Sequence, residues 1–178
     1  DYWDGRAHLD KITFRPIPEA STRLVELETG GIHLMGEVPG QELERLEDTE
    51  GIKIDSVIGT NYRILAMNTE REPFDDKNVR QAIVHAVDKQ KIIDVVYPGV
   101  AIKAEGPLPP TSWAFDESFK GLQHDMDKAK ELLAESDYPD GFEVKLMISE
   151  DQRMQRDAVL IQSMLEPLGI VVSIESVE

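Results

Sequence analysis

Pairs of carboxylates are the side chains of this sequence whose types and spacing come nearest to a catalytic pattern. Asp75 and Asp76 are adjacent, and Asp125 and Asp127 lie two positions apart. Two carboxylates can divide general acid and general base work between them. Each pair also stands just before an apolar periodic segment, where aspartate accepts hydrogen bonds from the free amides of a first helical turn. We therefore expect helix capping, with a carboxylate-dependent hydrolase as the alternative.

Metal, nucleophile and nucleotide chemistry have little basis in the sequence. His85 and Asp88 are three positions apart, as metal ligands on a helix can be, but no HExxH pattern or third ligand accompanies them. The sequence has no cysteine, no G-x-S-x-G elbow, no P-loop and no G-x-G-x-x-G motif. We expect no catalytic residue, no metal, no cofactor and no enzymatic activity.

The charge of the chain limits its partners. Lys and Arg number 19 against 35 Asp and Glu, a formal net charge of −16 over 178 residues. Such a chain repels nucleic-acid backbones and anionic membranes. The acidic residues are spread through periodic segments, which leaves open a module whose acidic helices dock on a partner protein. No apolar run approaches the roughly 20 residues of a membrane span.

The elements that must position these side chains alternate along the first third of the chain. "LDKITFRPI" alternates apolar and polar residues and ends at Pro16 and Pro18, which predicts a strand. A helix is expected from Glu19 to Gly30, followed by the strand "IHLMGEV" and a second helix after Pro39. Residues 11–50 thus predict β-α-β-α with a parallel pair of strands.

The remaining residues predict a second series of helices and strands. Residues 52–68 are β-rich and are interrupted at Gly59. Helices are expected over residues 76–97, with a break and second cap at Asp88, and over 126–136 and 152–168. The strands "FEVKLMI" and "IVVSIESV" flank the last helix, which predicts a β-α-β unit. "GPLPPTSW" contains three prolines and predicts a stiff loop.

In this order, several stretches resemble the extracytoplasmic solute-binding proteins of ABC importers, in the family 5 group that takes oligopeptides, dipeptides and nickel chelates. The resemblance rests on "DYWDGRAHLDKITFRPIPEASTRLVELETGGIHL", "NTEREPFDDKNVRQAIVHAVDKQKII", "GPLPP", "HDMDKAKELLAESDYPDGF" and "LEPLGIVVSIE". These pieces extend over nearly the whole chain in the family's order and spacing.

The resemblance implies a fold and a place within it. We expect an α/β middle fragment of the periplasmic-binding-protein-like type II fold, a two-lobe clamp with mixed sheets and packed helices. Residues 1–59 would belong to the first lobe and residues 60–178 to the second, with a hinge near Thr60 to Asn68. The opening without methionine suggests an excised piece, so the secretion signal or lipoprotein anchor would lie outside it.

The resemblance also implies a function. It suggests the substrate-binding component of an importer, which captures a peptide or related small solute outside the cytoplasm and delivers it to ABC permease subunits. We expect a monomer. Oligopeptide, dipeptide and nickel-chelate specificity all fit, and acidity does not favour nickel because no histidine cluster is present.

Two groups of residues are candidates for contact with the solute. Thr60, Asn61 and Tyr62 stand at the proposed hinge, where the family's connecting strands line the cleft, and offer polar groups and an aromatic face. We expect Pro109, Pro110 and Trp113 to form a stiff apolar wall, which would lose little entropy when a ligand arrives. The alternatives are a half-buried Tyr62 bonded to backbone and a Trp113 that closes the loop over its own lobe.

Overall fold

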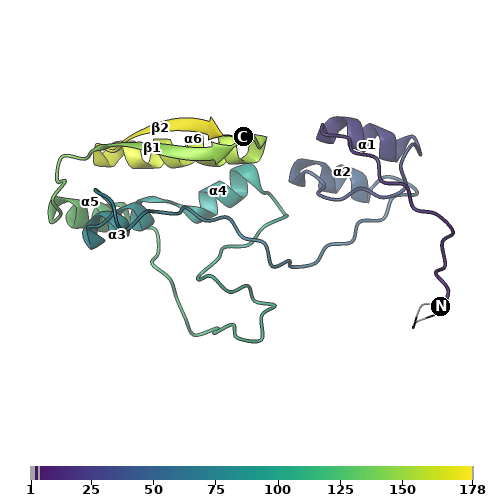
Figure 1. The fold of residues 1–178 in the computed structure, drawn as a ribbon, viewed down its shortest axis with the longest axis horizontal. Helices are drawn as coiled ribbons and strands as arrows, with labels where there is room; N and C mark the ends of the chain where they lie inside the picture. The colour runs from purple at the N-terminus through teal and green to yellow at the C-terminus, as the bar shows by residue number, and fades with distance from the viewer. Residues whose placement is uncertain (1–2, 4, 178) are drawn as a thin grey trace. The chain divides into compact units, whose positions relative to one another are not determined.

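The computed structural model of the chain describes residue 3 and residues 5–177. The backbone divides into two units, Asp1–Ile54 and Asp55–Glu178. In Figure 1 the first unit carries α1 and α2, and the second carries the remaining labelled helices and both strands.

The first unit is built on two short helices and a 3₁₀ turn. α1 spans Ala20–Glu28, the 3₁₀ turn spans Gly40–Glu42 and α2 spans Leu43–Glu47. Leu24 and Leu46 are the buried side chains of α1 and α2. Arg45 links these segments, because its Nε lies 2.8 Å from Glu42 and its guanidinium also pairs with Glu28.

The prediction of two strands in this unit is wrong. Residues 9–17 and 32–38 are irregular backbone, and Ile12 and Phe14 are 65% and 90% exposed. A strand is stable only where a neighbouring backbone pairs with it. Alternation predicts which side chains would face a core but supplies no partner, and the described residues of this unit form no ladder. The predicted parallel pair is therefore absent there, and residues 52–68 are likewise not assigned to a strand.

Aspartates set the helix starts of the second unit. α3 spans Lys77–Ala86, α4 spans Lys89–Val96 and α5 spans Met126–Ala134. Asp76, Asp88 and Asp125 are their N-caps, and each accepts a hydrogen bond from a backbone amide of the first turn. α3 and α4 are thus separated at Asp88, where the sequence predicts a second cap.

The β-α-β unit predicted for the last third of the chain is confirmed. β1 spans Glu143–Ser149, α6 spans Gln152–Leu165, a 3₁₀ turn spans Glu166–Leu168 and β2 spans Val171–Val177. The strands pair in parallel from Glu143 with Val171 to Ser149 with Val177, and they form the sheet of the described residues. Gly169, at φ 72°, ends the 3₁₀ turn in the left-handed conformation that glycine adopts readily.

The core of the second unit lies where helices meet the parallel sheet. Figure 1 shows α6 beneath β1 and β2, and α3 beside α5. Leu65 and Met67, on the extended segment before α3, pack against this core. Within the described residues, no helix combines the length and apolar character needed to cross a bilayer. The buried core residues are Val79, Ala82, Ile83, Ala86, Ala129, Leu132, Leu133, Leu165, Leu168, Ile170 and Val172.

Candidate functional site

The predicted hinge residues lie in exposed, extended backbone. Thr60 and Asn61 are exposed, and Tyr62 is 55% exposed, so Tyr62 is not the half-buried, backbone-bonded residue considered as the alternative. The segment enters the core a few residues later at Leu65. These three side chains are accessible to a ligand.

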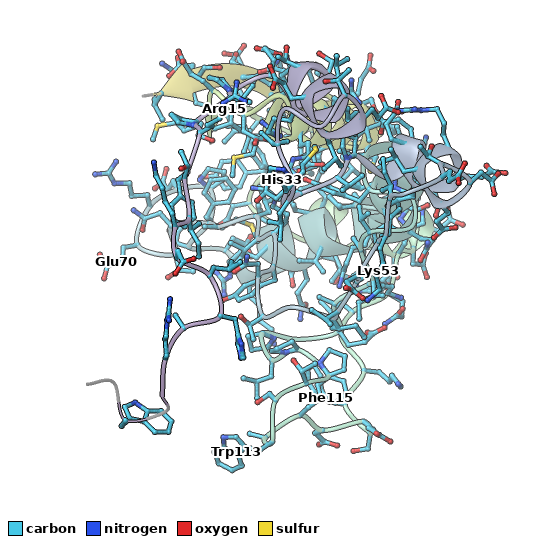
Figure 2. All side chains as sticks on the ribbon, turned by 90° about the vertical axis from the view of Figure 1, so that its right-hand side faces the viewer. Arg15, His33, Lys53, Glu70, Trp113 and Phe115 are labelled. Atoms are coloured by element: carbon cyan, nitrogen blue, oxygen red, sulfur yellow. The ribbon has the colours of Figure 1, made fainter. Side chains whose placement is uncertain are left out.

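The proline-rich loop presents its tryptophan to solvent. Pro109 is half-buried, Pro110 is exposed and Trp113 is 98% exposed. Figure 2 shows Trp113 at the outer edge of its loop, so it does not close the loop over its own lobe. Among the described residues, the hydrogen bonds of residues 109–113 stay within their own loop, and none joins them to residues 60–62.

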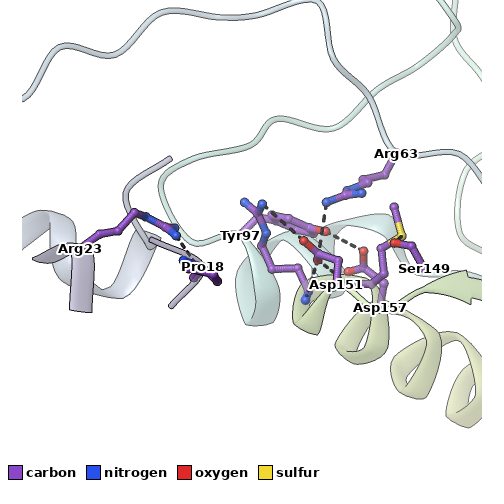
Figure 3. A network of polar contacts seen from close by, with 9 residues as sticks. Pro18, Arg23, Arg63, Tyr97, Ser149, Asp151 and Asp157 are labelled. Carbon is purple, nitrogen blue, oxygen red and sulfur yellow. Dashed lines mark hydrogen bonds and ion pairs between the residues drawn. The ribbon is translucent and has the colours of Figure 1, made fainter. Parts of the chain in front are cut away.

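Immediately after Tyr62, a polar cluster forms that consists of Arg63, Tyr97, Asp151 and Asp157 (Figure 3). The hydroxyl of Tyr97 donates a hydrogen bond of 2.6 Å to Oδ2 of Asp157. The guanidinium of Arg63 lies 3.9 Å from Asp151. Oδ1 of Asp157 is buried and has no hydrogen-bond partner among the described residues.

Three elements position this cluster. Tyr97 is the C-cap of α4 and is followed by Pro98, which cannot continue the helix, and by Gly99 in the left-handed conformation at φ 71°. Asp151 is the N-cap of α6, and Asp157 lies in the second turn of the same helix, which packs on α4. Arg63 comes from the extended segment before α3. The cluster therefore joins the candidate hinge to two helices.

Burial dominates the electrostatics of the tyrosine and its partner. Burial, the hydrogen bond to Asp157 and the charge of that carboxylate raise the pKa of Tyr97 to about 12. Burial also raises the pKa of Asp157, and this effect exceeds the lowering by the Tyr97 hydroxyl and the Arg63 charge. Tyr97 is consequently a neutral hydrogen-bond donor at physiological pH.

The pKa of Asp151 is shifted in the opposite direction. Its burial would raise its pKa, but the amides of Met154 and Arg153 donate hydrogen bonds of 3.0 and 2.8 Å to its Oδ1, and the net pKa is lowered. It is an ionised cap beside Arg63, whose side chain is 44% exposed. Arg63 can therefore offer N–H donors to an anionic or carbonyl group of a ligand.

The location of the cluster is typical of ligand sites in α/β proteins. Asp151 follows β1 by two residues, so the cluster lies at the carboxyl end of that strand. Open α/β sheets bind ligands outside the carboxyl ends of their strands. A charged donor, a neutral phenol and two carboxylates at this point can orient a polar solute.

The side chains considered for catalysis or metal binding make structural contacts instead. Asp76 and Asp125 accept hydrogen bonds from the amides of Asn78 and Lys128 at 2.7 and 2.9 Å, so both carboxylate pairs include a helix cap. Nδ1 of His85 lies 2.7 Å from the carbonyl oxygen of Gln123. In the described part of the chain, no group of three or more potential ligands gathers that could hold a metal ion.

Sequence reasoning missed all four members of the polar cluster. Tyr97 and Asp157 are 60 positions apart, and nothing in either local pattern indicates that they meet. The one local signal is the position of Arg63 directly after Asn61 and Tyr62, which extends the predicted site by a single residue.

A family model and curated relatives match the chain over almost its full length. The model described as "Bacterial extracellular solute-binding proteins, family 5 Middle" matches residues 1–178. Heme-binding protein A of Haemophilus influenzae is 35% identical over 175 residues, which cover 96% of this chain and 32% of that protein. The chain thus spans about a third of the length of this relative.

Solved structures share the fold of this chain. The periplasmic binding protein DppA from Helicobacter pylori, in complex with the peptide STSA, is 39% identical and superposes with a TM-score of 0.89 over 100% of this chain and 35% of its own. A dipeptide-binding protein from Pseudoalteromonas sp. SM9913, in complex with Met-Leu, is 34% identical with a TM-score of 0.75 over 91% of this chain and 33% of its own. The α/β architecture is that of a fragment of a type II periplasmic binding protein.

Proposed function

Since this chain belongs to family 5 of the bacterial extracellular solute-binding proteins, we propose that the whole protein captures a peptide or peptide-like small solute for an ABC importer. The observation that carries the proposal is the match over residues 1–178, together with relatives whose structures hold the peptide STSA and the dipeptide Met-Leu. The protein would act outside the cytoplasm, as a binding protein without catalysis, and deliver its solute to membrane permease subunits.

Thr60, Asn61, Tyr62, Pro109, Pro110 and Trp113 are the proposed contact residues. Their accessibility supports this assignment, because Tyr62 and Trp113 expose aromatic surface that a solute can cover. We add Arg63 to the proposed contacts as a donor to the carboxylate or carbonyl groups of a peptide. Its side chain is partly exposed, and its ion pair with Asp151 is long. We also propose that the first lobe ends at residue 59 and that the second begins at residue 60.

A peptide is the solute class that these side chains suit best. Aromatic faces accept varied side chains, and a guanidinium recognises the carboxylate or carbonyl groups that every peptide carries. Oligopeptides, dipeptides and nickel chelates are all compatible with the family.

Calorimetry on the full-length protein that contains this chain tests the function. We expect heat from Met-Leu or a longer peptide and none from a sugar. The double substitution Asn61→Ala with Tyr62→Ala should weaken peptide binding about tenfold or more, because it removes an amide and an aromatic contact. Tyr138→Phe is the matched control, since Tyr138 bonds to Glu72 and belongs to no proposed contact.

Heat from a sugar alone would contradict the proposed function. If peptides bind but the double substitution matches the control, the function would stand and the assignment of the hinge residues would fail.

A further inference from the structure

The connection between α4 and α5, residues 98–124, carries Trp113 and contains neither helix nor strand. Figure 1 shows it as the long connection that runs out from α4 and returns to α5. Long connections without secondary structure are uncommon in compact domains and are usually functional or disordered. The contacts within this loop decide between these possibilities.

Glu105 fastens the two arms of the loop together. Its Oε2 accepts hydrogen bonds from the backbone amide of Gly121 at 3.1 Å and from Nε2 of Gln123 at 2.9 Å. Its Oε1 lies 3.3 Å from Nζ of Lys103, which also donates to the side chain of Gln123. One carboxylate therefore joins residues that are 16 and 18 positions away along the chain.

The arms lie in direct contact at Glu105. A Cβ atom on Gly121 would sit 2.4 Å from the backbone oxygen of Glu105, which is closer than any side chain tolerates. On the opposite arm, a Cβ on Gly106 would lie 3.2 Å from the ring of Phe119. We call this paired region, residues 103–106 with 119–123, the stem of the loop.

Helices α3 and α4 anchor the stem at both arms. Nζ of Lys89 donates a hydrogen bond of 3.1 Å to the carbonyl of Ala104. Nδ1 of His85 lies 2.7 Å from the carbonyl oxygen of Gln123, and the amide of Asp125 donates to the carbonyl of His85 at 2.9 Å. The stem is thus attached to the rigid part of the unit.

Beyond the stem, the tip is ordered by its own turns. The amide of Ser112 donates to the carbonyl of Pro109 at 2.9 Å, and the amide of Phe115 donates to the carbonyl of Ser112 at 3.1 Å. Asp116 accepts from both the amide and the hydroxyl of Ser118. This ordered tip holds Trp113 98% exposed, although burying such a side chain would be favourable.

We propose that Glu105 is a positioning residue for solute recognition, which fixes the stem so that Trp113 is presented to an apolar side chain of the bound peptide. This inference rests on the proposed function. A contact held ready before binding loses less conformational entropy when the ligand arrives, so the stem raises affinity without touching the solute. The gain in affinity is therefore largest for peptides whose side chains the ring of Trp113 can cover.

Dipeptide titrations of the full-length protein test the coupling. Glu105→Ala and Trp113→Ala should each weaken Met-Leu about five- to tenfold, and the double variant should bind no more weakly than Trp113→Ala. The affinity for Gly-Gly, which offers no side chain to Trp113, should change less than about twofold. Glu117→Ala, an exposed carboxylate of the same loop outside the stem, is the matched control and should leave both affinities unchanged.

A second measurement reports the order of the loop without any ligand. In a full-length protein in which Trp3 and every tryptophan outside this chain are replaced by phenylalanine, the tryptophan fluorescence comes from Trp113, and Glu105→Ala should lower its anisotropy while Glu117→Ala does not. Unchanged anisotropy would overturn the inference, as would equal weakening of Met-Leu and Gly-Gly. A wild-type protein that binds no peptide overturns the proposed function as well. Equal peptide binding by wild type and both variants overturns this inference and the assignment of Trp113 as a contact residue, and leaves solute capture standing.

Discussion

At the scale of single residues, the hydrogen bond between Tyr97 and Asp157 adds to the effect of burial in raising the pKa of Tyr97. Tyr97 closes α4 and Asp157 belongs to α6, so their 2.6 Å contact joins two helices through side chains. Because the phenol is partly buried and its hydroxyl donates a hydrogen bond to the charged carboxylate of Asp157, ionising the phenol is disfavoured. Both groups keep a proton more tightly than they would in an unfolded chain.

A spectroscopic titration of the phenol tests this coupling. Tyr97 should ionise near its raised pKa of about 12, and Asp157→Asn should lower that pKa because the charge of the carboxylate is removed while burial remains. The folded pKa of Tyr97 lies above the unfolded value of about 10, so its contribution to stability is full below pH 10 and is lost as the pH rises toward 12. Absorbance near 295 nm, followed against pH, measures the step.

Tyr97→Phe is the control, since it should delete the high-pH step and leave the other tyrosine signals in place. A step that stays unmoved in Asp157→Asn would show that burial alone sets the pKa and that the contact contributes nothing to it.

At the scale of elements, aspartate caps define the start of α3, α4, α5 and α6. Asp76 has the widest role, because its Oδ1 accepts from the amide of Asn78 at 2.7 Å and its Oδ2 accepts from the amide of Asp137 at 3.2 Å. The second bond attaches the start of α3 to the turn after α5. The same side chain therefore caps one helix and holds a second element beside it.

Asp76→Ala should lower the free energy of unfolding by about 1–2 kcal/mol, since both amides lose their acceptor. Chemical denaturation followed by circular dichroism measures the change. Asp127→Ala is the matched control, because Asp127 is exposed in the first turn of α5 without being its cap, and it should change stability by less than about 0.5 kcal/mol. Equal effects of the two substitutions would refute the capping argument.

At the scale of the whole molecule, folding and binding draw on different parts. The core of the second unit is contributed by α3, α5, α6, β1 and β2, all within Asp55–Glu178. Solute capture by a two-lobe clamp needs contacts from both lobes and water excluded on closure. The chain spans about a third of the length of its relatives, so many of those contacts would come from outside it.

The 178-residue chain by itself should therefore keep the fold of its second unit but bind peptide more than about a hundredfold more weakly than the full-length protein. Losing three net hydrogen bonds of roughly 1 kcal/mol each is enough for this difference. Hydrogen exchange of α3 and β1 measures folding, and calorimetry with the same dipeptide measures binding. Equal affinities for the two proteins would show that the proposed cleft between lobes is misplaced.

The sequence by itself determined the elements whose signals are local. Asp76 and Asp88 identify two helix starts through capping chemistry, and Gly169 with its flanking apolar segments identifies the β1-α6-β2 unit. These signals operate within one or two turns of the chain, where residue type and spacing are sufficient. The order of such stretches also identified the family, which the match over residues 1–178 confirms.

Only the tertiary structure decided the features that depend on distant partners. The alternating residues around Ile12 and Phe14 do not form a strand in the described chain, because a strand needs a second backbone that its own sequence cannot supply. The contact of Tyr97 with Asp157 spans 60 positions, and that of Glu105 with Gln123 spans 18. Hydrogen bonds act over about 3 Å, so packing alone determines which of the many possible donors and acceptors meet.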